Sequence, residues 1–271
     1  MDQFLENENL TVTENKYFVK GETNGILELD KLPKDSIFTL EPNAVVKLIA
    51  KGTLKDSKLS FEVKEHAALK LSFVSFGQFD NVDFNINLEE GSECTCAFAD
   101  FTQGKNHSKV TVNLNGKHSS IVWHLASLAK NDDDKIFDVF INHNSSDTYS
   151  NSMNYGVCEG NSSLSFLGKS DIKMNSSKST ALQAAKIMVF DEGCKAKASP
   201  LLCIGNNDVT AAHSATCGQI NAEHIYYLES RGISEKDAKR LITLGYLNPI
   251  LKYFEDDEET SALIKEKIEE R

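Results

Sequence analysis

The sequence predicts an all-β body followed by a small α-helical subdomain. From about residue 16 to residue 217, apolar and polar side chains alternate with a period of two, as in "VDFNINL" at residues 82–88, and this period is typical of strands. After Gly218 the pattern changes to helix caps and apolar positions at helical spacing. β-sandwiches and β-solenoids both show such alternation, so the pattern alone leaves both architectures open.

The β body consists of short apolar runs separated by turn sequences. The runs include "FVSF", "VTVNL", "IFDVFI", "LSFL" and "IMVF", and turns such as "EEGSEC", "LNGKHSS" and "CEGNSS" separate them at irregular intervals. A strict hexapeptide repeat is absent, which argues against a regular left-handed solenoid. Asparagine is abundant between the runs. It commonly initiates turns, and it can also form side-chain ladders between stacked turns, which would fit an irregular solenoid.

The helical subdomain begins with clear capping signals. Asn221 is suited to cap a first helix, and Gly232 is suited to the left-handed position that ends it. Ser234 opens "SEKD", a capping-box pattern that starts a second helix. We therefore divide the chain into a β-helix or sandwich body at residues 1–220 and a helical subdomain at residues 221–271.

Two further segments complete this subdomain. "NPILKY" predicts a third helix with proline in its first turn, and after the acidic run "EDDEE" the segment "TSALIKEKIEER" predicts a short final helix that we expect to be mobile. Helices of this length bury little apolar surface by themselves. They must pack on the β body, on each other or on a partner protein.

Composition excludes several classes of function. The chain has 271 residues and a net charge of −11, with no evident basic patch, so nucleic acid and anionic membranes are poor partners. Its acidic N-terminus lacks the features of a signal peptide, and no apolar run is long enough to span a membrane. We expect a cytoplasmic protein whose six cysteines are free thiols or ligands.

The stretch "VTAAHSATCGQINAEHIYYLESRGIS", residues 209–234, carries the most specific signal. Its order of histidine, Ser-Ala-Thr, Gly-Gln, an acidic helix start, Tyr-Leu and Ser-Arg-Gly-Ile resembles the SufB/SufD family of iron–sulfur cluster assembly proteins. Upstream, "YGVCEGNSSLSFLGKSDI" and "DEGCKAKASPLLCIGNNDV" are similar to turns and a Ser-Pro strand of that family. The resemblance covers residues 130–254. It implies a right-handed parallel β-helix with a C-terminal helical subdomain, which favours the solenoid over the sandwich.

The resemblance also implies a role and partners. In this family the helices dock an ABC-type ATPase, and strands near the histidine join two β-helix subunits where a nascent cluster is thought to be built. SufB-type members carry a cysteine where this chain has Ala185, and a glutamate where it has Ser214. The family's long N-terminal helical domain is also missing. The resemblance is therefore to a SufD-like short form, a non-catalytic accessory subunit whose partners are a SufC-like ATPase and a SufB-like chain or a second copy of itself.

Three side chains are candidate contacts for iron or a cluster. His213 matches the family histidine, Cys217 lies four residues later on the same expected strand face, and Cys203 lies ten residues earlier. A partly buried histidine and packed thiols are the structural alternatives. Cys94 and Cys96 form a same-face pair without a second pair at zinc-site spacing. We expect no cofactor in the isolated chain, and a transient cluster or iron only in the complex.

The first helix carries the candidate docking surface for the ATPase. Tyr226, Tyr227, Leu228 and Arg231 lie on it, and aromatic residues and arginine are enriched at the centres of interfaces. The alternative is that one tyrosine packs on the β body while the other is merely exposed. No G-x-x-x-x-G-K-[ST] sequence is present, so ATP would be bound by the partner.

Two other functions stay open from the sequence. Some β-helices act on polysaccharides with clustered carboxylates, and the tightest acidic cluster of the body is at residues 132–134, in a loop-like "KNDDDK". A net-acidic chain would repel acidic polysaccharides. The other alternative is a stand-alone zinc or iron protein that uses His213, Cys203 and Cys217.

Overall fold

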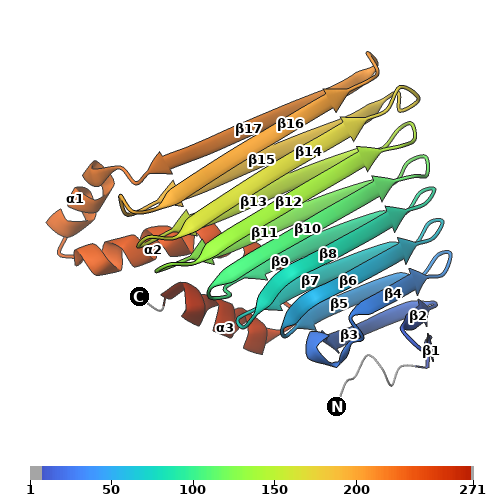
Figure 1. Ribbon diagram of the computed structural model, residues 1–271, viewed down its shortest axis with the longest axis horizontal. Helices are drawn as coiled ribbons and strands as arrows, with labels where there is room; N and C mark the ends of the chain where they lie inside the picture. The colour runs from blue at the N-terminus through green and yellow to red at the C-terminus, as the bar shows by residue number, and fades with distance from the viewer. Residues whose placement is uncertain (1–7, 270–271) are drawn as a thin grey trace.

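The computed structural model describes residues 8–269 and consists of two β-sheets wound from one chain into a solenoid, with helices at its C-terminal end (Figure 1). Strands of even number form one sheet together with β1, and the odd-numbered strands from β3 onward form the other. Apart from the antiparallel pair β1–β2, every strand pair among the described residues is parallel. This confirms the predicted parallel β-solenoid and excludes the sandwich.

The even-numbered sheet has the spatial order β1-β2-β4-β6-β8-β10-β12-β14-β16. Its strands are β1 (Leu10–Thr13), β2 (Lys16–Val19), β4 (Asp35–Leu40), β6 (Leu54–Val63), β8 (Phe79–Leu88), β10 (Lys105–Leu114), β12 (Asp134–His143), β14 (Ser163–Ile172) and β16 (Lys195–Ile204). The odd-numbered sheet comprises β3 (Glu22–Glu28), β5 (Val45–Lys51), β7 (Ala68–Ser75), β9 (Glu93–Asp100), β11 (Ser120–Ala129), β13 (Tyr149–Cys158), β15 (Ser179–Val189) and β17 (Val209–Gln219). A short 3-10 helix, η1 (Leu29–Lys31), follows β3.

Successive coils grow longer along the chain. Val45 pairs with Ala68, 23 positions later, whereas Tyr149 pairs with Thr180, 31 positions later. The added residues lengthen strands and turns, and the register keeps each inward position opposite another inward position. A shift by one residue would turn the apolar set of a strand out of the lumen. This variable coil length is why no fixed repeat is visible in the sequence.

The lumen is filled by aromatic side chains in the early coils. Tyr17 stacks on Phe38 with ring centroids 4.5 Å apart, and Phe38 stacks on Phe61 at 5.0 Å. Towards the C-terminal end the inward positions become smaller and more polar, and they include buried Ser152 and Gln183. Burial of these large rings contributes strongly to stability, because apolar stabilisation scales with the buried apolar area.

A charged network is enclosed among the apolar side chains of the lumen. Lys135 and Asp100 are both fully buried, and Lys135 Nζ donates to Asp100 Oδ2 at 2.8 Å and to the carbonyl oxygen of Leu128 at 2.8 Å. Ser127 and Asn106 also donate to the Asp100 carboxylate, at 2.6 and 3.0 Å. A buried charge is tolerated only with such partners, so this network ties the turns of two coils together.

The turns repeat one backbone conformation at the same corner of successive coils. His66, Gly91, His118 and Asp147 have φ values of 56°, 64°, 62° and 57°, in the left-handed region that asparagine, aspartate, histidine and glycine tolerate best. At Gly91 an added Cβ would also lie 2.3 Å from Nδ1 of His66, so the His66 ring would have to move. Stacked turns therefore explain the Gly- and Asn-rich sequences between the apolar runs.

An asparagine ladder crosses the outer face of the even-numbered sheet. Asn87 donates to Glu62 at 2.7 Å, Asn113 to Asn87 at 2.8 Å and Asn142 to Asn113 at 2.8 Å. These residues occupy successive positions of one register row on neighbouring strands. Asparagine side chains thus form a ladder here, but this row lies on the strands and not in the turns where the sequence suggested a ladder.

The capping residues predicted both ends of α1 and the start of α2. In α1 (Ala222–Ser230), Oδ1 of Asn221 accepts from the Glu223 amide at 2.8 Å. Gly232 follows with φ 87°, and the amide of Ile233 donates to the carbonyl of Leu228, which completes a Schellman motif. Oγ of Ser234 accepts from the Asp237 amide at the start of α2 (Glu235–Leu247).

The last two elements, η2 (Asn248–Tyr253) and α3 (Glu258–Glu269), together form what we name the C-terminal strap, residues 248–269. Its apolar side chains lie on the outer face of the odd-numbered sheet in a second hydrophobic cluster. Small side chains on the sheet, such as Ala97, Ala99 and Ala126, let the strap approach closely, and Ser72 Oγ donates to the Tyr253 carbonyl at 2.8 Å.

The acidic run is part of this packing. Asp256 forms ion pairs with Lys47 and Lys70 of the odd-numbered sheet, and Asp257 forms one with Lys51. Ile264 and Ile268 of α3 are fully buried. The expectation of a mobile final helix is therefore wrong, because its apolar side finds a complementary sheet face of its own chain.

Candidate functional site

The solenoid ends in an open coil. β17 pairs with β15 on one side only, and β16 pairs with β14 on one side only, so both strands present a free edge. Nearly every residue of β17 is exposed, although alternate side chains point towards the lumen. Nothing in the described part of the chain covers this end, and Figure 1 shows β16 and β17 as its outermost strands.

His213 and Cys217 lie on the lumen side of β17. His213 pairs in register with Gln183, and Cys217 pairs with Ile187. Both of these β15 residues are buried in the lumen, and in-register neighbours of a parallel sheet point to the same face. The two candidate ligands therefore share one face at the open end, as their even spacing predicted.

Cys203 lies on a different face. It pairs with Asp171 on the outer side of the even-numbered sheet, where Lys169 and Lys173 contact the Asp171 carboxylate at 3.2 and 2.9 Å. The structure thus does not bring Cys203 to the face of His213 and Cys217. Among residues 8–269, no three histidine, cysteine or carboxylate side chains are grouped closely enough to hold a metal ion.

Two cysteines without a predicted role, Cys158 and Cys194, interact electrostatically with each other, and Cys158 also interacts with Cys217. Burial, and then the neighbouring Cys194 and Cys217 thiols, raise the pKa of Cys158 to about 12. Burial also raises the pKa of Cys217, although a hydrogen bond from the Ala198 backbone opposes this shift. Cys194 donates to the Gly160 carbonyl at 3.5 Å. The sequence spacing of Cys158, Cys194 and Cys217 did not predict that they interact, because it is the stacking of the coils that brings them together.

Cys94 and Cys96 are packing residues of the lumen. Both are buried, and burial raises the pKa of each thiol above its usual value. A thiol held in its neutral form is a poor ligand and a poor nucleophile.

The α1 helix presents the candidate docking residues to solvent. Tyr226 is 73% exposed and Tyr227 is 57% exposed, while Ile225 of the same helix is buried. The guanidinium of Arg231 lies over the Tyr227 ring, 5.3 Å from its centroid, and Leu228 is half-buried. Two adjacent exposed tyrosines are unusual for a surface that only faces water, because they leave a large apolar area uncovered.

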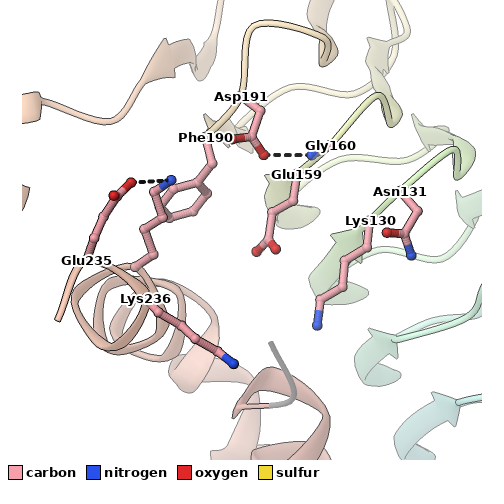
Figure 2. A pocket seen from close by; sticks show the side chains of 9 residues that line it. Lys130, Asn131, Glu159, Gly160, Phe190, Asp191, Glu235 and Lys236 are labelled. Atoms are coloured by element: carbon pink, nitrogen blue, oxygen red, sulfur yellow. Dashed lines mark hydrogen bonds and ion pairs between the residues drawn. The ribbon is translucent and has the colours of Figure 1, made fainter.

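A cleft of about 600 Å³ lies between the N-terminal turn of α2 and the turns of the late coils (Figure 2). Lys130, Glu159 and Lys236 point towards its open space. The Asp191 carboxylate accepts from the Gly160 amide at 2.7 Å. The cleft carries both signs of charge and only one aromatic lining residue, Phe190, so it is unlike an enclosed pocket for an apolar ligand.

The acidic cluster at residues 132–134 serves the turn. The Asp133 carboxylate is buried and accepts from the backbone amides of Gly104, at 2.6 Å, and Lys130, at 2.8 Å. A carboxylate committed to two backbone donors is not free for acid–base chemistry on a sugar. Asp133, at the centre of this cluster, therefore has a structural role in the turn.

One lumen residue escaped the sequence analysis. Gln183 is 8% exposed, and it donates to Ser170 Oγ at 2.8 Å and to the Leu201 carbonyl at 2.9 Å. Its position in the sequence could have revealed it, because Gln183 falls in the alternation of "STALQAAKIMV" at an inward position, as Ala181, Ala185 and Ile187 do. A polar residue in an inward phase marks a place where burial is offset by specific partners.

Comparison with known proteins agrees with this architecture. Residues 34–246 match the family model described as "SUF system FeS cluster assembly, SufBD core domain". Part of the chain is 35% identical to the iron-sulfur cluster assembly protein SufD of Bacillus subtilis, over 99 residues that cover 36% of this chain and 23% of that protein. It is 24% identical to SufD of Escherichia coli over 149 residues, which cover 54% of this chain and 35% of that protein.

A longer match is to an iron-sulfur cluster assembly SufBD family protein of Mycobacterium tuberculosis, 22% identical over 215 residues, or 78% of this chain and 25% of that protein. The chain therefore spans between 23% and 35% of the length of these relatives. None of the helices in the described residues has the length and apolar character needed to cross a membrane. With a SufBD core over most of its length and the parallel solenoid to match, the chain belongs to the SufB/SufD family of iron–sulfur cluster assembly proteins.

Proposed function

We propose that this chain is a cytoplasmic, non-catalytic, SufD-like subunit of an iron–sulfur cluster assembly complex. It pairs with a second SufB/SufD-like subunit, a SufB-like chain or another copy of itself, through the last coil, and it docks a SufC-like ABC ATPase through α1. The observation that carries the proposal is the uncovered end of a SufBD core, at which β17 keeps a free edge next to an exposed helix.

The two free edges are not equivalent for pairing. β17 runs over Val209–Gln219 without proline, whereas β16 contains Pro200. Proline lacks an N–H group and is confined in sheets to edges and strand starts. A second subunit that continued the even-numbered sheet would convert β16 into a central strand with a missing donor. Sheet extension through β17 is therefore the favoured mode of pairing.

The same end offers donors suited to the cargo. Imidazole and thiolate both bind iron and iron–sulfur clusters, and His213 and Cys217 place one imidazole and one thiol on the lumen face. Burial raises the pKa of the Cys217 thiol, so this thiol would have to lose its proton when it binds the cargo. Two side chains are fewer than the four that a cluster commonly takes. The remaining ligands would come from the second subunit, so the cargo would be held only in the paired state. Cys203 is the weakest of the three predicted contacts, because it faces the other side of the even-numbered sheet.

α1 supplies the docking surface for the ATPase. Tyr226, Tyr227 and Arg231 are exposed, and residues of these types dominate binding energy at interfaces. The strap is already covered by the β body, so among the predicted helices α1 and the adjacent turn of α2 have the most surface left for a partner. The cleft of Figure 2 begins beside this turn and would extend the contact area.

Docking is tested by pull-down and titration with the cognate ATPase. The double variant Tyr226→Ala/Tyr227→Ala should weaken binding by at least about 2 kcal/mol, or roughly thirtyfold, if the pair is a binding hot spot. Tyr149→Ala is the matched control, because Tyr149 is also an exposed tyrosine, at 37%, but lies on β13. Equal affinity of the double variant and the control would contradict docking through α1.

Pairing is tested by analytical ultracentrifugation with a SufB-like subunit and with the chain alone. Ala215→Glu adds a charge at the centre of β17 and should abolish association. Val12→Glu adds the same charge at an exposed position at the other end of the solenoid and should leave association intact. Association that survives Ala215→Glu would exclude the β17 end as the interface.

A further inference from the structure

Gln183 lies one register step before His213 in a row of lumen residues. Trp123 pairs with Ser152, Ser152 with Gln183, and Gln183 with His213, on four successive strands of the odd-numbered sheet. Neighbouring strands are about 4.8 Å apart, so in-register side chains on one face can contact each other. Gln183 is therefore the buried polar group nearest in register to the exposed histidine.

The orientation of the Gln183 amide is determined by its partners. Its Nε2 donates to Ser170 Oγ at 2.8 Å and to the Leu201 carbonyl at 2.9 Å. The Leu201 carbonyl can only accept, so the atom that contacts it must be the amide nitrogen. The reverse assignment of nitrogen and oxygen is thereby excluded. Both amide hydrogens are directed to the even-numbered sheet, and Oε1 remains as the available acceptor.

The Gln183 side chain is nine-tenths buried, yet its Oε1 accepts no hydrogen bond from any residue in the range 8–269. An acceptor left without a donor in such a position costs free energy. His213 is exposed and pairs in register with Gln183, so its ring lies on the same face of the sheet as this amide and offers an N–H donor there.

Gly168 is independent evidence that the Gln183 amide oxygen needs steric room in the lumen. It lies in the middle of β14, where glycine weakens a strand. A Cβ at this position would lie 2.7 Å from Gln183 Oε1. Glycine thus keeps the lumen open at the place where the amide oxygen needs room.

We propose that Gln183 is the positioning residue of His213. Its Oε1 accepts a hydrogen bond from one ring nitrogen of the histidine, which selects one neutral tautomer and one ring orientation. The other ring nitrogen then keeps its lone pair and faces the open end. This is the second-shell arrangement that orients metal-binding histidines in proteins. The use of that nitrogen for the cargo rests on the proposed function, but the hydrogen bond itself does not.

The test is the tautomer of His213 in the isolated chain, read from the nitrogen shifts of its ring by NMR of ¹⁵N-labelled protein above neutral pH. His213→Gln assigns the signals. The wild-type ring should show well-separated nitrogen shifts. In Gln183→Leu the tautomer ratio should change roughly fivefold, the effect of one ordinary hydrogen bond.

Two further variants separate positioning from general stability. Gly168→Ala displaces the amide without altering Gln183 and should shift the tautomer ratio in the same direction, so it also serves if Gln183→Leu does not fold. Asn154→Leu is the control, because Asn154 is another buried lumen amide that bonds a side chain, Trp123, at 2.9 Å, but on β13. It should lower stability and leave the tautomer ratio unchanged.

An unchanged tautomer ratio in the folded Gly168→Ala and Gln183→Leu proteins would overturn the proposal, as would an equal change in Asn154→Leu. These measurements need no partner and no cargo. Loss of ATPase docking or of subunit pairing would refute the proposed function and leave the Gln183–His213 contact standing. An unchanged tautomer in a chain that still pairs and docks would do the reverse.

Discussion

Phe254→Ala should cost this protein far more stability than removal of the ion pairs beside it. Phe254 is fully buried in the cluster between the strap and the odd-numbered sheet, and truncation of a buried phenylalanine costs about 3–5 kcal/mol. The side chain of Asp256 is 54% exposed and that of Lys47 is 33% exposed, and such pairs are worth about 0–1 kcal/mol. Apolar burial, not charge, should therefore hold the strap.

The measurement is urea unfolding of the wild type, Phe254→Ala and Asp256→Asn, with hydrogen exchange of the strap amides to separate local detachment from global unfolding. Phe254→Ala should release protection throughout η2 and α3, and Asp256→Asn should leave it nearly unchanged in 0.1–0.5 M salt, where exposed pairs are screened. A loss in Asp256→Asn that equals or exceeds the loss in Phe254→Ala would refute this reasoning.

Three more outcomes follow from the fold. Burial holds the pKa of His124 and of His143 at about 4, and the Lys252 charge adds to this effect at His124. As pH falls from about 6.5 to 4, the unfolded chain binds protons before the folded chain does, so the free energy of unfolding should drop by roughly 3 kcal/mol per histidine. His124→Gln should make the free energy of unfolding less dependent on pH in this window. Asn113→Ala removes two hydrogen bonds of the asparagine ladder and should lower the free energy of unfolding in urea by about 1–2 kcal/mol. An alanine substitution at an outward position of an early coil that has no asparagine ladder should cost less. Lys135→Met leaves the Asp100 carboxylate in the lumen without its ion-pair partner and should cost about 3–5 kcal/mol. Partial recovery of stability in Lys135→Met/Asp100→Asn would identify the pair, and no recovery would contradict the pairing.

Local sequence signals predicted the elements that depend on local physics. Asn221 and Ser234 cap their helices, and Gly232 has the left-handed conformation that ends α1. The alternation of "VDFNINL" forms β8 with Phe84 and Ile86 in the lumen. Each of these outcomes is determined by a residue and its near neighbours in sequence, through a backbone hydrogen bond, a permitted φ or the period of a strand.

The same distinction, between local sequence signals and contacts between coils, applies to the residues of the candidate site. The even spacing of His213 and Cys217 was sufficient to predict a shared face, because both lie on one strand. Cys203 lies on another strand, so its face depended on the register of β16 against β14, and register is set by contacts between coils. For the same reason, the sequence did not predict a role for Cys194 or Gln183, whose neighbours are determined by contacts between coils.

By itself, then, the chain's order of residues determined its strands, its helix caps, the inward phase of each strand and the motif of its family. Only the tertiary structure decided how the coils stack, which thiols and amides become neighbours, and that the acidic strap closes over its own sheet while α1 stays uncovered. The physical reason is that side-chain periodicity is a property of one segment, whereas adjacency between coils arises from apolar burial and hydrogen bonds among residues 23 to 31 or more positions apart.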